Sequence, residues 1–285
     1  MNYVFAFVGL FAALTQASAW YLSWLPWQNP TVDRSDTPEW SKLSVTYLKF
    51  SGLPINVNDA IANGWTKDKS CDARSYFKGN RYVLKGDTAV MLLFDSNGKI
   101  AGIQNGIPKS AVGNLKLPWI SERDLNVITA YFTDPENICS GSRPPSNYLG
   151  DQLLLQTGNE SSNTMAIPFK QEDLAGTKWV EGGCFPAMGR HYWYNISADM
   201  DCSDFYPMFL LYSKKKRLTG FGWVTVGYAE SPRYEHPPPK RLGHRLGDLG
   251  FFQEETMPKC IPHLEVLTTQ HVYLDKRPYL NLCFI

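Results

Sequence analysis

Two stretches of this chain match each other without a gap, and this internal similarity constrains the fold more than any other feature of the sequence. Residues 91–103 align with residues 209–221. Each stretch is an apolar run, a polar turn and a second apolar run that contains glycine, which is the pattern of a β-hairpin. Asn97-Gly98 in the first stretch is a strong turn signal. We therefore expect two hairpins built to one plan, which is the signature of a repeated unit.

The similarity continues on both sides of the hairpins with small gaps. Each copy has a short helix-like segment before the hairpin and a strand-like segment that leads to a cysteine after it. The shared landmarks are Trp65, Cys71 and Cys139 in the first copy and Trp179, Cys184 and Cys283 in the second. Asn58 and Gly64 are expected to bound the first helix as its N-cap and its C′ residue.

These observations predict an α+β fold that arises by tandem internal duplication. Each copy is expected to be a helix packed on an antiparallel β-sheet with hairpins, stapled by disulfides. The first copy spans residues 45–140 and the second spans residues 150–285, with a segment rich in Gly, Ser and Pro between them. Residues 20–44 form an aromatic N-terminal segment. We expect the Tyr and Trp side chains of Trp20–Trp27 to pack over the second copy, with the lining of a ligand pocket as the alternative.

The N-terminus indicates export. An apolar run at Val4–Leu14 is too short to span a bilayer, and it is followed by Ala17-Ser18-Ala19, a small-x-small pattern that signal peptidase cleaves. Residues 1–19 are therefore predicted to be a signal peptide. The mature chain is expected to be secreted and extracellular, with no membrane partner after cleavage.

The cysteines agree with export, because an even number in a secreted chain favours disulfides. The chain has 6 of them. Matching positions in the two copies pair the first four, and elimination pairs the last two. The expected bridges are Cys71–Cys139, Cys184–Cys283 and Cys202–Cys260. Sequons at Asn159 and Asn195 predict a glycoprotein.

Charge and composition disfavour two classes of function, nucleic-acid binding and a structural or matrix role. Lys and Arg number 28 against 27 Asp and Glu, a formal net charge of +1, so the basic footprint of a nucleic-acid-binding protein is missing. Hydrophobic residues are 44% and charged residues 19%, which predicts a folded core and disfavours a structural or matrix protein of biased composition.

All 5 histidines fall in the second copy, so the fold shared by both copies does not require them. We predict that His191, His236 and His271 converge on copper or zinc, because three imidazoles with an open position suit either metal. Glu235 is expected to serve there as a fourth ligand, an orienting group or a general base. His244 and His263 are weaker candidates, the former in a basic loop. This hypothesis makes the protein a metal-dependent extracellular oxidoreductase.

Two alternatives stay open. The histidines can instead be hydrogen-bonded, half-buried side chains among aromatic neighbours. In that case the protein is a non-catalytic secreted binding protein for a small organic ligand or a glycan. The sequence contains no GxSxG motif and no glycine-rich phosphate loop, and paired cysteines leave no thiolate nucleophile, so other catalytic templates are disfavoured.

Overall fold

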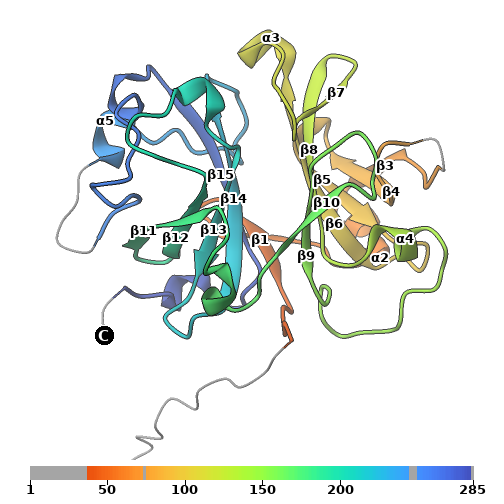
Figure 1. Ribbon diagram of the computed structural model, residues 1–285. Helices are drawn as coiled ribbons and strands as arrows, with labels where there is room; N and C mark the ends of the chain where they lie inside the picture. The colour runs from red at the N-terminus through yellow and green to blue at the C-terminus, as the bar shows by residue number, and fades with distance from the viewer. Residues whose placement is uncertain (1–36, 73–74, 244–248, 284–285) are drawn as a thin grey trace, which may run out of the picture. The chain divides into compact units, whose positions relative to one another are not determined.

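The computed structural model describes residues 37–72, 75–243 and 249–283. Strands account for 38% of the described residues and helices for 13%. The predicted α+β class is therefore wrong: the fold is mostly β, with two antiparallel sheets and small helices (Figure 1). The predicted signal peptide at 1–19 and residues 20–36 of the aromatic segment lie outside the described residues.

One sheet has eight strands in the order β10-β9-β8-β6-β5-β4-β3, with β7 paired to β8 beside this path. Its strands are β3 (Trp65–Lys69), β4 (Asn80–Leu84), β5 (Asp87–Phe94), β6 (Ile100–Pro108), β7 (Ile120–Glu122), β8 (Leu125–Tyr131), β9 (Leu153–Gln156) and β10 (Thr164–Ile167).

The other sheet has seven strands in the order β11-β12-β13-β14-β15-β1-β2. Its strands are β1 (Leu43–Val45), β2 (Ser51–Leu53), β11 (Trp179–Phe185), β12 (Gly189–Tyr194), β13 (Met208–Tyr212), β14 (Leu218–Val226) and β15 (Leu267–Tyr273).

The helices that the structure describes are short. They are α2 (Val57–Ala62), α3 (Lys109–Val112), α4 (Pro135–Ile138) and α5 (Pro239–Leu242), with 3-10 turns η1 (Gln171–Leu174), η2 (Cys202–Asp204), η3 (Ile261–His263) and η4 (Pro278–Leu280). The longest of them, α2, has 6 residues, so helices of this size cannot cover a sheet face and helix-on-sheet duplication is not shown. Within the described residues, no helix has the length and apolar character needed to cross a membrane.

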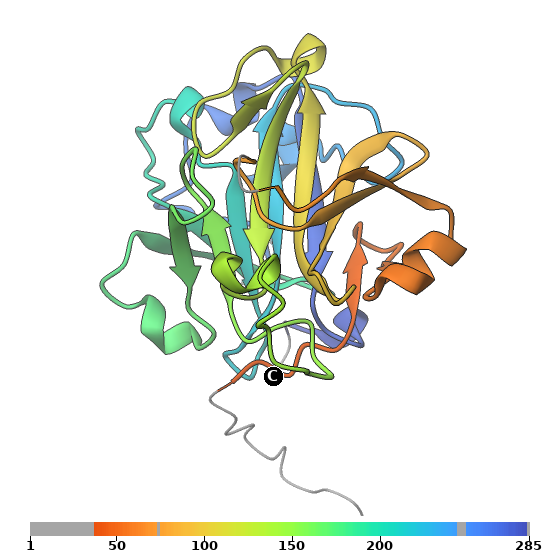
Figure 2. The same ribbon diagram turned by 90° about the vertical axis from the view of Figure 1, so that its right-hand side faces the viewer.

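Strand pairing crosses the predicted boundary between the copies. The hairpin β1–β2 comes first in the chain but joins β15 of the seven-stranded sheet, and β9–β10 joins β8 of the eight-stranded sheet. Both views show β1 beside the seven-stranded sheet, whose strand β15 is far away in sequence (Figures 1 and 2). The boundaries at 45–140 and 150–285 therefore stay a prediction, and each sheet contains strands from both ranges.

Both predicted hairpins are confirmed. Leu92 pairs with Ile103 in β5–β6, and Leu210 pairs with Phe221 in β13–β14. At the first turn, the Asp95 carboxylate accepts hydrogen bonds from the backbone N–H groups of Asn97 and Lys99, at 2.9 and 2.8 Å. Gly98 has a φ of 79°, which favours glycine and explains the Asn-Gly turn.

Helix α2 begins earlier than the sequence predicts. Asn56, not Asn58, is the N-cap, and its side-chain oxygen accepts from the backbone N–H of Asp59 at 2.9 Å. Gly64 follows the C-cap with a φ of 82°, which is the left-handed conformation expected after a helix. The N-cap lies earlier than predicted because Asn56 forms a β-bridge with Lys99. This bridge ends the extended segment at Asn56, and the helix begins at the next residue.

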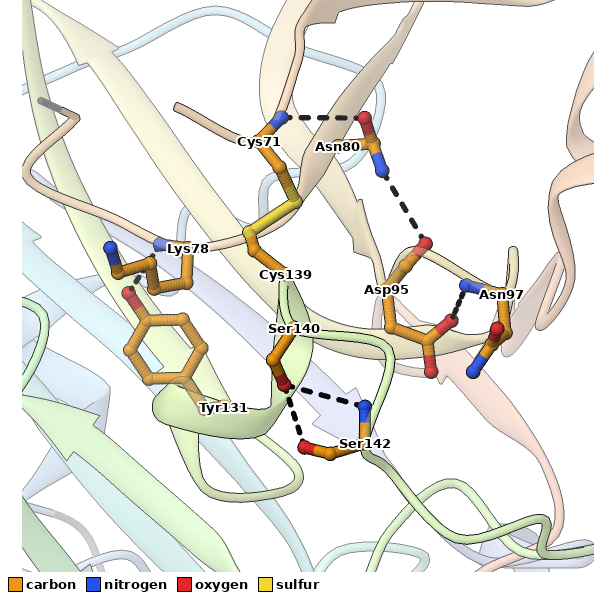
Figure 3. Close-up of a disulfide and its surroundings, with 9 residues drawn as sticks. All are labelled: Cys71, Lys78, Asn80, Asp95, Asn97, Tyr131, Cys139, Ser140 and Ser142. Carbon is orange, nitrogen blue, oxygen red and sulfur yellow. Dashed lines mark hydrogen bonds between the residues drawn. A yellow bond between two sulfur atoms is a disulfide. The ribbon is translucent and has the colours of Figure 1, made fainter. Parts of the chain in front are cut away.

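All three predicted disulfides are present: Cys71–Cys139, Cys184–Cys283 and Cys202–Cys260. Figure 3 shows how the first is held beside the β5–β6 turn. The backbone N–H of Cys71 donates to the side-chain oxygen of Asn80 at 3.3 Å, and the Asn80 amide donates to the Asp95 carbonyl at 3.4 Å. The disulfide and the turn are therefore linked through one side chain.

The largest apolar cluster lies between the two sheets and draws on both. Leu92, Ile103 and Ile128 come from the eight-stranded sheet, and Leu210, Phe221 and Val272 come from the other sheet. Trp40 lies in the part of the predicted aromatic segment that the structure describes. It joins this cluster and donates its indole N–H to the Leu218 carbonyl at 2.9 Å. Burial of apolar side chains by both sheets stabilises them together.

Candidate functional site

A cavity of about 310 Å³ lies on the outer face of the seven-stranded sheet, beneath the long connection between β14 and β15. We call this connection, residues 227–266, the insertion. Figure 1 shows α5 and its neighbouring segments on the side of this sheet that faces away from the eight-stranded sheet. The cavity walls are largely aromatic: Tyr47, Phe185, Trp193, Phe205, Phe209, Phe251 and Phe252.

Strand alternation places the sheet side of the cavity. His191 and Trp193 are two residues apart on β12, and Thr269 and His271 are two apart on β15, so each pair shares the outer face. Gly222 on β14 pairs with His271. A Cβ at Gly222 would lie 2.1 Å from the Phe209 ring, so glycine there allows the ring to cross β14.

Glu235 enters the site from the insertion. Its backbone forms a β-bridge with Thr269, which turns its half-buried carboxylate toward the end of β15. The carboxylate accepts from the Tyr47 backbone N–H at 2.7 Å and from the Thr269 hydroxyl at 3.0 Å. Nδ1 of His271 lies 3.0 Å from the same group.

These contacts keep Glu235 ionised. Burial alone would raise the pKa of its carboxyl, but His271 and the hydrogen bonds from His271, Tyr47 and Thr269 hold the pKa below its ordinary value. A carboxylate can only accept, so Nδ1 of His271 carries the proton that it donates. Glu235 therefore orients His271, and its predicted role as a general base stays a prediction.

His191 is the most deeply buried of the histidines that the structure describes, with 1% of its surface exposed. Burial lowers the pKa of His191 to about 3, and repulsion between the two rings when both are protonated adds to the shift. Its Nδ1 lies 3.3 Å from the Gly183 carbonyl, which can only accept, so Nδ1 carries the proton of the neutral ring. The ring centroids of His191 and His271 are 6.4 Å apart.

Nε2 of His191 and Nε2 of His271 are both buried without a hydrogen-bond partner. Because Nδ1 of each ring is already engaged, Nε2 is the nitrogen that each leaves for a ligand in the cavity that both residues line. Two buried polar atoms without partners on one apolar wall are unusual in a folded protein and call for a functional explanation.

His236 also lines the cavity, but its Nε2 lies 3.0 Å from the Ala229 carbonyl and its ring stacks on exposed Tyr228. The structure thus brings His191, His236, His271 and Glu235 to one cavity. Within the described ranges, however, no group of three or more His, Cys, Asp or Glu side chains is placed to hold a metal ion. The metal site stays a prediction.

The other predicted positions lie away from this cavity. His263 is exposed in η3, and His244 lies outside the described residues. Asn159, in the loop between β9 and β10, and Asn195, directly after β12, are both exposed, and their glycosylation stays a prediction.

The sequence gives little sign of the aromatic walls. Phe251-Phe252 in the insertion and Trp193 in an aromatic run can be recognised in the sequence as aromatic pairs or runs. No pattern around Tyr47 connects it with Glu235, which is 188 positions away. Only the pairing of β1 with β15 brings Tyr47 to the cavity.

The outer face of the eight-stranded sheet is built differently. Arg81 on β4, 3% exposed, forms ion pairs with Asp68 and with Glu122, and its contact with Glu122 measures 2.8 Å. Lys69 and Tyr76 also contact the Glu122 carboxylate. Burial would raise the pKa of Glu122, but the hydrogen bonds from Arg81, Lys69 and Tyr76 lower it to about 2. Ion-paired side chains satisfy one another on this face.

Comparisons of the chain with protein-family models, with curated proteins and with solved structures find no match. The functional argument therefore depends on the geometry of the cavity.

Proposed function

We propose that this protein binds a small apolar molecule in the aromatic cavity of the seven-stranded sheet. The observation that carries the proposal is a partly open cavity of about 310 Å³ lined by aromatic side chains with few polar groups. Small-molecule sites are typically concave and apolar, with a small number of polar groups that orient the ligand. A dry cavity of about 150 Å³ holds benzene, so this one has room for roughly two fused rings.

The mostly apolar lining favours an organic ligand over a glycan, because a glycan needs many hydrogen-bond partners. The three disulfides are typical of a protein from an oxidising, extracellular compartment. Together with the signal-like N-terminus, they support a secreted carrier or scavenger as the biological setting.

Naphthalene tests the proposal directly. We expect saturable binding of one molecule per chain, measured by calorimetry and by the change in tryptophan fluorescence, since Trp193 lines the cavity. Val224→Phe adds volume at a buried lining position of β14 and should abolish binding. Val226→Phe, at a position of the same strand that is 39% exposed, is the matched control and should bind as the parent does. Absence of saturable binding, or equal binding by both variants, would contradict the proposal.

A metal-dependent oxidoreductase remains a second candidate, supported by one observation: the unpartnered Nε2 atoms of His191 and His271 line the same cavity. Imidazole nitrogens are ligands of copper and zinc. Calorimetric titration of the untagged protein with Cu²⁺ and Zn²⁺ tests it, with His191→Phe as the control variant. Binding that is tighter in the parent than in this variant would support a metal site.

A further inference from the structure

We infer that the cavity selects aromatic molecules that carry hydroxyl groups, and that these hydroxyls donate their hydrogens to Nε2 of His191 and Nε2 of His271. The inference rests on the proposed function and adds the chemical class of the ligand. Its basis is the hydrogen-bonding state of each polar group on the cavity wall.

The two histidines present acceptors. Nδ1 of His191 faces the Gly183 carbonyl and Nδ1 of His271 faces the Glu235 carboxylate, and both of these partners accept hydrogen bonds. In the neutral rings the proton therefore sits on Nδ1, and Nε2 offers a lone pair. Burial holds His191 neutral, with a pKa of about 3.

Each of the remaining polar side chains on the wall already has at least one hydrogen-bond partner. The Glu235 carboxylate accepts from Tyr47, from Thr269 and from His271, and the Thr269 hydroxyl is occupied as the donor in one of these bonds. His236 uses Nε2 to contact the Ala229 carbonyl. Among the buried side-chain atoms of the lining residues, the two Nε2 atoms are thus the ones without a partner, and a hydroxyl reaches them when the side chains that cover them shift.

This combination discriminates between ligands. A hydroxyl that reaches either Nε2 removes an unsatisfied buried acceptor, whereas an ether or ketone oxygen brings another acceptor to the same wall. Sites built around a ligand's hydroxyl reject the analogue without it more strongly than apolar pockets reject a missing methylene. Because the two rings are 6.4 Å apart between centroids, a ligand with two hydroxyls can use both acceptors.

The test compares 2-naphthol with 2-methoxynaphthalene, which has the same rings and no donor, and uses naphthalene as the common core. We expect the protein to bind 2-naphthol about tenfold or more tightly than the ether at pH 7.5, as one hydrogen bond to a buried acceptor would give. The ether is the more apolar molecule, so transfer from water alone would favour it. A preference for naphthol therefore reports the acceptors.

Two variants test whether the preference for naphthol over the ether comes from the two histidines. His191→Phe and His271→Phe each remove one acceptor and keep a ring in the aromatic wall, and each should reduce the ratio of the naphthol and ether dissociation constants toward one. If His271→Phe fails to fold because Glu235 loses its partner, His191→Phe leaves that contact intact and still tests the inference.

The possible failures are distinct. If none of the three compounds binds, the proposed function is wrong, and this inference fails with it. If naphthalene and the ether bind as tightly as naphthol, the cavity is a ligand site but its selectivity for hydroxyls is refuted. If naphthol is preferred equally by the parent and by both variants, the assignment to the two histidines is refuted.

Discussion

His191 is an imidazole on a sheet face where aromatic and aliphatic side chains surround it. An unmade hydrogen bond at a buried polar atom costs about 1–3 kcal/mol, so its free Nε2 is a cost to the folded protein. Arg81 occupies a similar place in the eight-stranded sheet, since it pairs with Leu93 as His191 pairs with Leu211. Arg81 is satisfied by carboxylates, whereas His191 is left for a ligand.

The pH dependence of stability should reveal the buried His191. Its pKa is about 3 in the folded protein, below its ordinary value of 6.5, so between these pH values the unfolded chain binds more protons. The free energy of unfolding therefore falls as pH decreases through this window, with a contribution of up to ~1.4 kcal/mol per pH unit from this group. Urea unfolding from pH 7 to pH 4 should give a steeper decline for the parent than for His191→Phe. Parallel curves would show that His191 is protonated without penalty.

At the scale of the elements, the sequence predicted the structures that depend on local patterns, above all the two similar hairpins. The hairpins β5–β6 and β13–β14 were predictable because apolar runs flank a polar turn in each. The first helix was predicted with its N-cap two residues too late, because Asn56, which bridges Lys99, caps it. The helix-like segment before Trp179 forms only the 3-10 turn η1. Joining of β1 to β15 is a long-range contact that periodicity does not encode.

The candidate site was predicted in part for the same reason. His191, His236, His271 and Glu235 were grouped because histidines occur only in the second half of the chain, and all four line one cavity. Their tautomers and free nitrogens depend on partners such as Gly183 and Ala229, which only the folded backbone places. The confinement of the histidines to the second copy therefore suggested a metal, while the contacts favour an apolar ligand.

The disulfide Cys202–Cys260 anchors the insertion over the cavity, and its removal should weaken ligand binding. Cys202→Ala with Cys260→Ala opens a loop of 58 residues in sequence separation, and Cys71→Ala with Cys139→Ala opens one of 68 in the other sheet. Loop-closure entropy predicts a similar loss for both, roughly 2–5 kcal/mol of unfolding free energy. Only the first pair should also reduce naphthalene affinity, measured by calorimetry at a temperature where both variants are folded. An equal loss of affinity in both variants would show that the Cys202–Cys260 disulfide has no specific effect on ligand binding in the cavity.

At the scale of the whole molecule, the described residues cluster as one unit, and polar contacts as well as apolar ones join its sheets. The side-chain amide of Asn105 on β6 donates to the side-chain oxygen of Gln270 on β15 at 3.2 Å, and the Gln270 amide donates to the Ala89 carbonyl on β5 at 3.0 Å. The Tyr234 hydroxyl adds a contact from the insertion to Asn105. Buried amides that satisfy one another across two sheets fix how the sheets are aligned.

Cutting the chain between Ser146 and Asn147 should give two fragments that fold only together. Fragment 37–146 would keep the hairpin β1–β2, whose partner β15 lies in the other fragment, and would lack β9–β10, which completes its own sheet. Each fragment alone would therefore expose an unpaired strand edge and half of the common apolar cluster. No described disulfide crosses the cut, so oxidised fragments can be prepared separately and mixed. We expect poor dispersion in the NMR spectrum of each fragment and a dispersed spectrum with a 1:1 mass by light scattering after mixing. If each fragment instead gives a well-dispersed spectrum as a monomer and the two do not associate, residues 45–140 and 150–285 are independent domains. In that case the pairing of β1–β2 with β15 and of β9–β10 with β8 is not needed for folding.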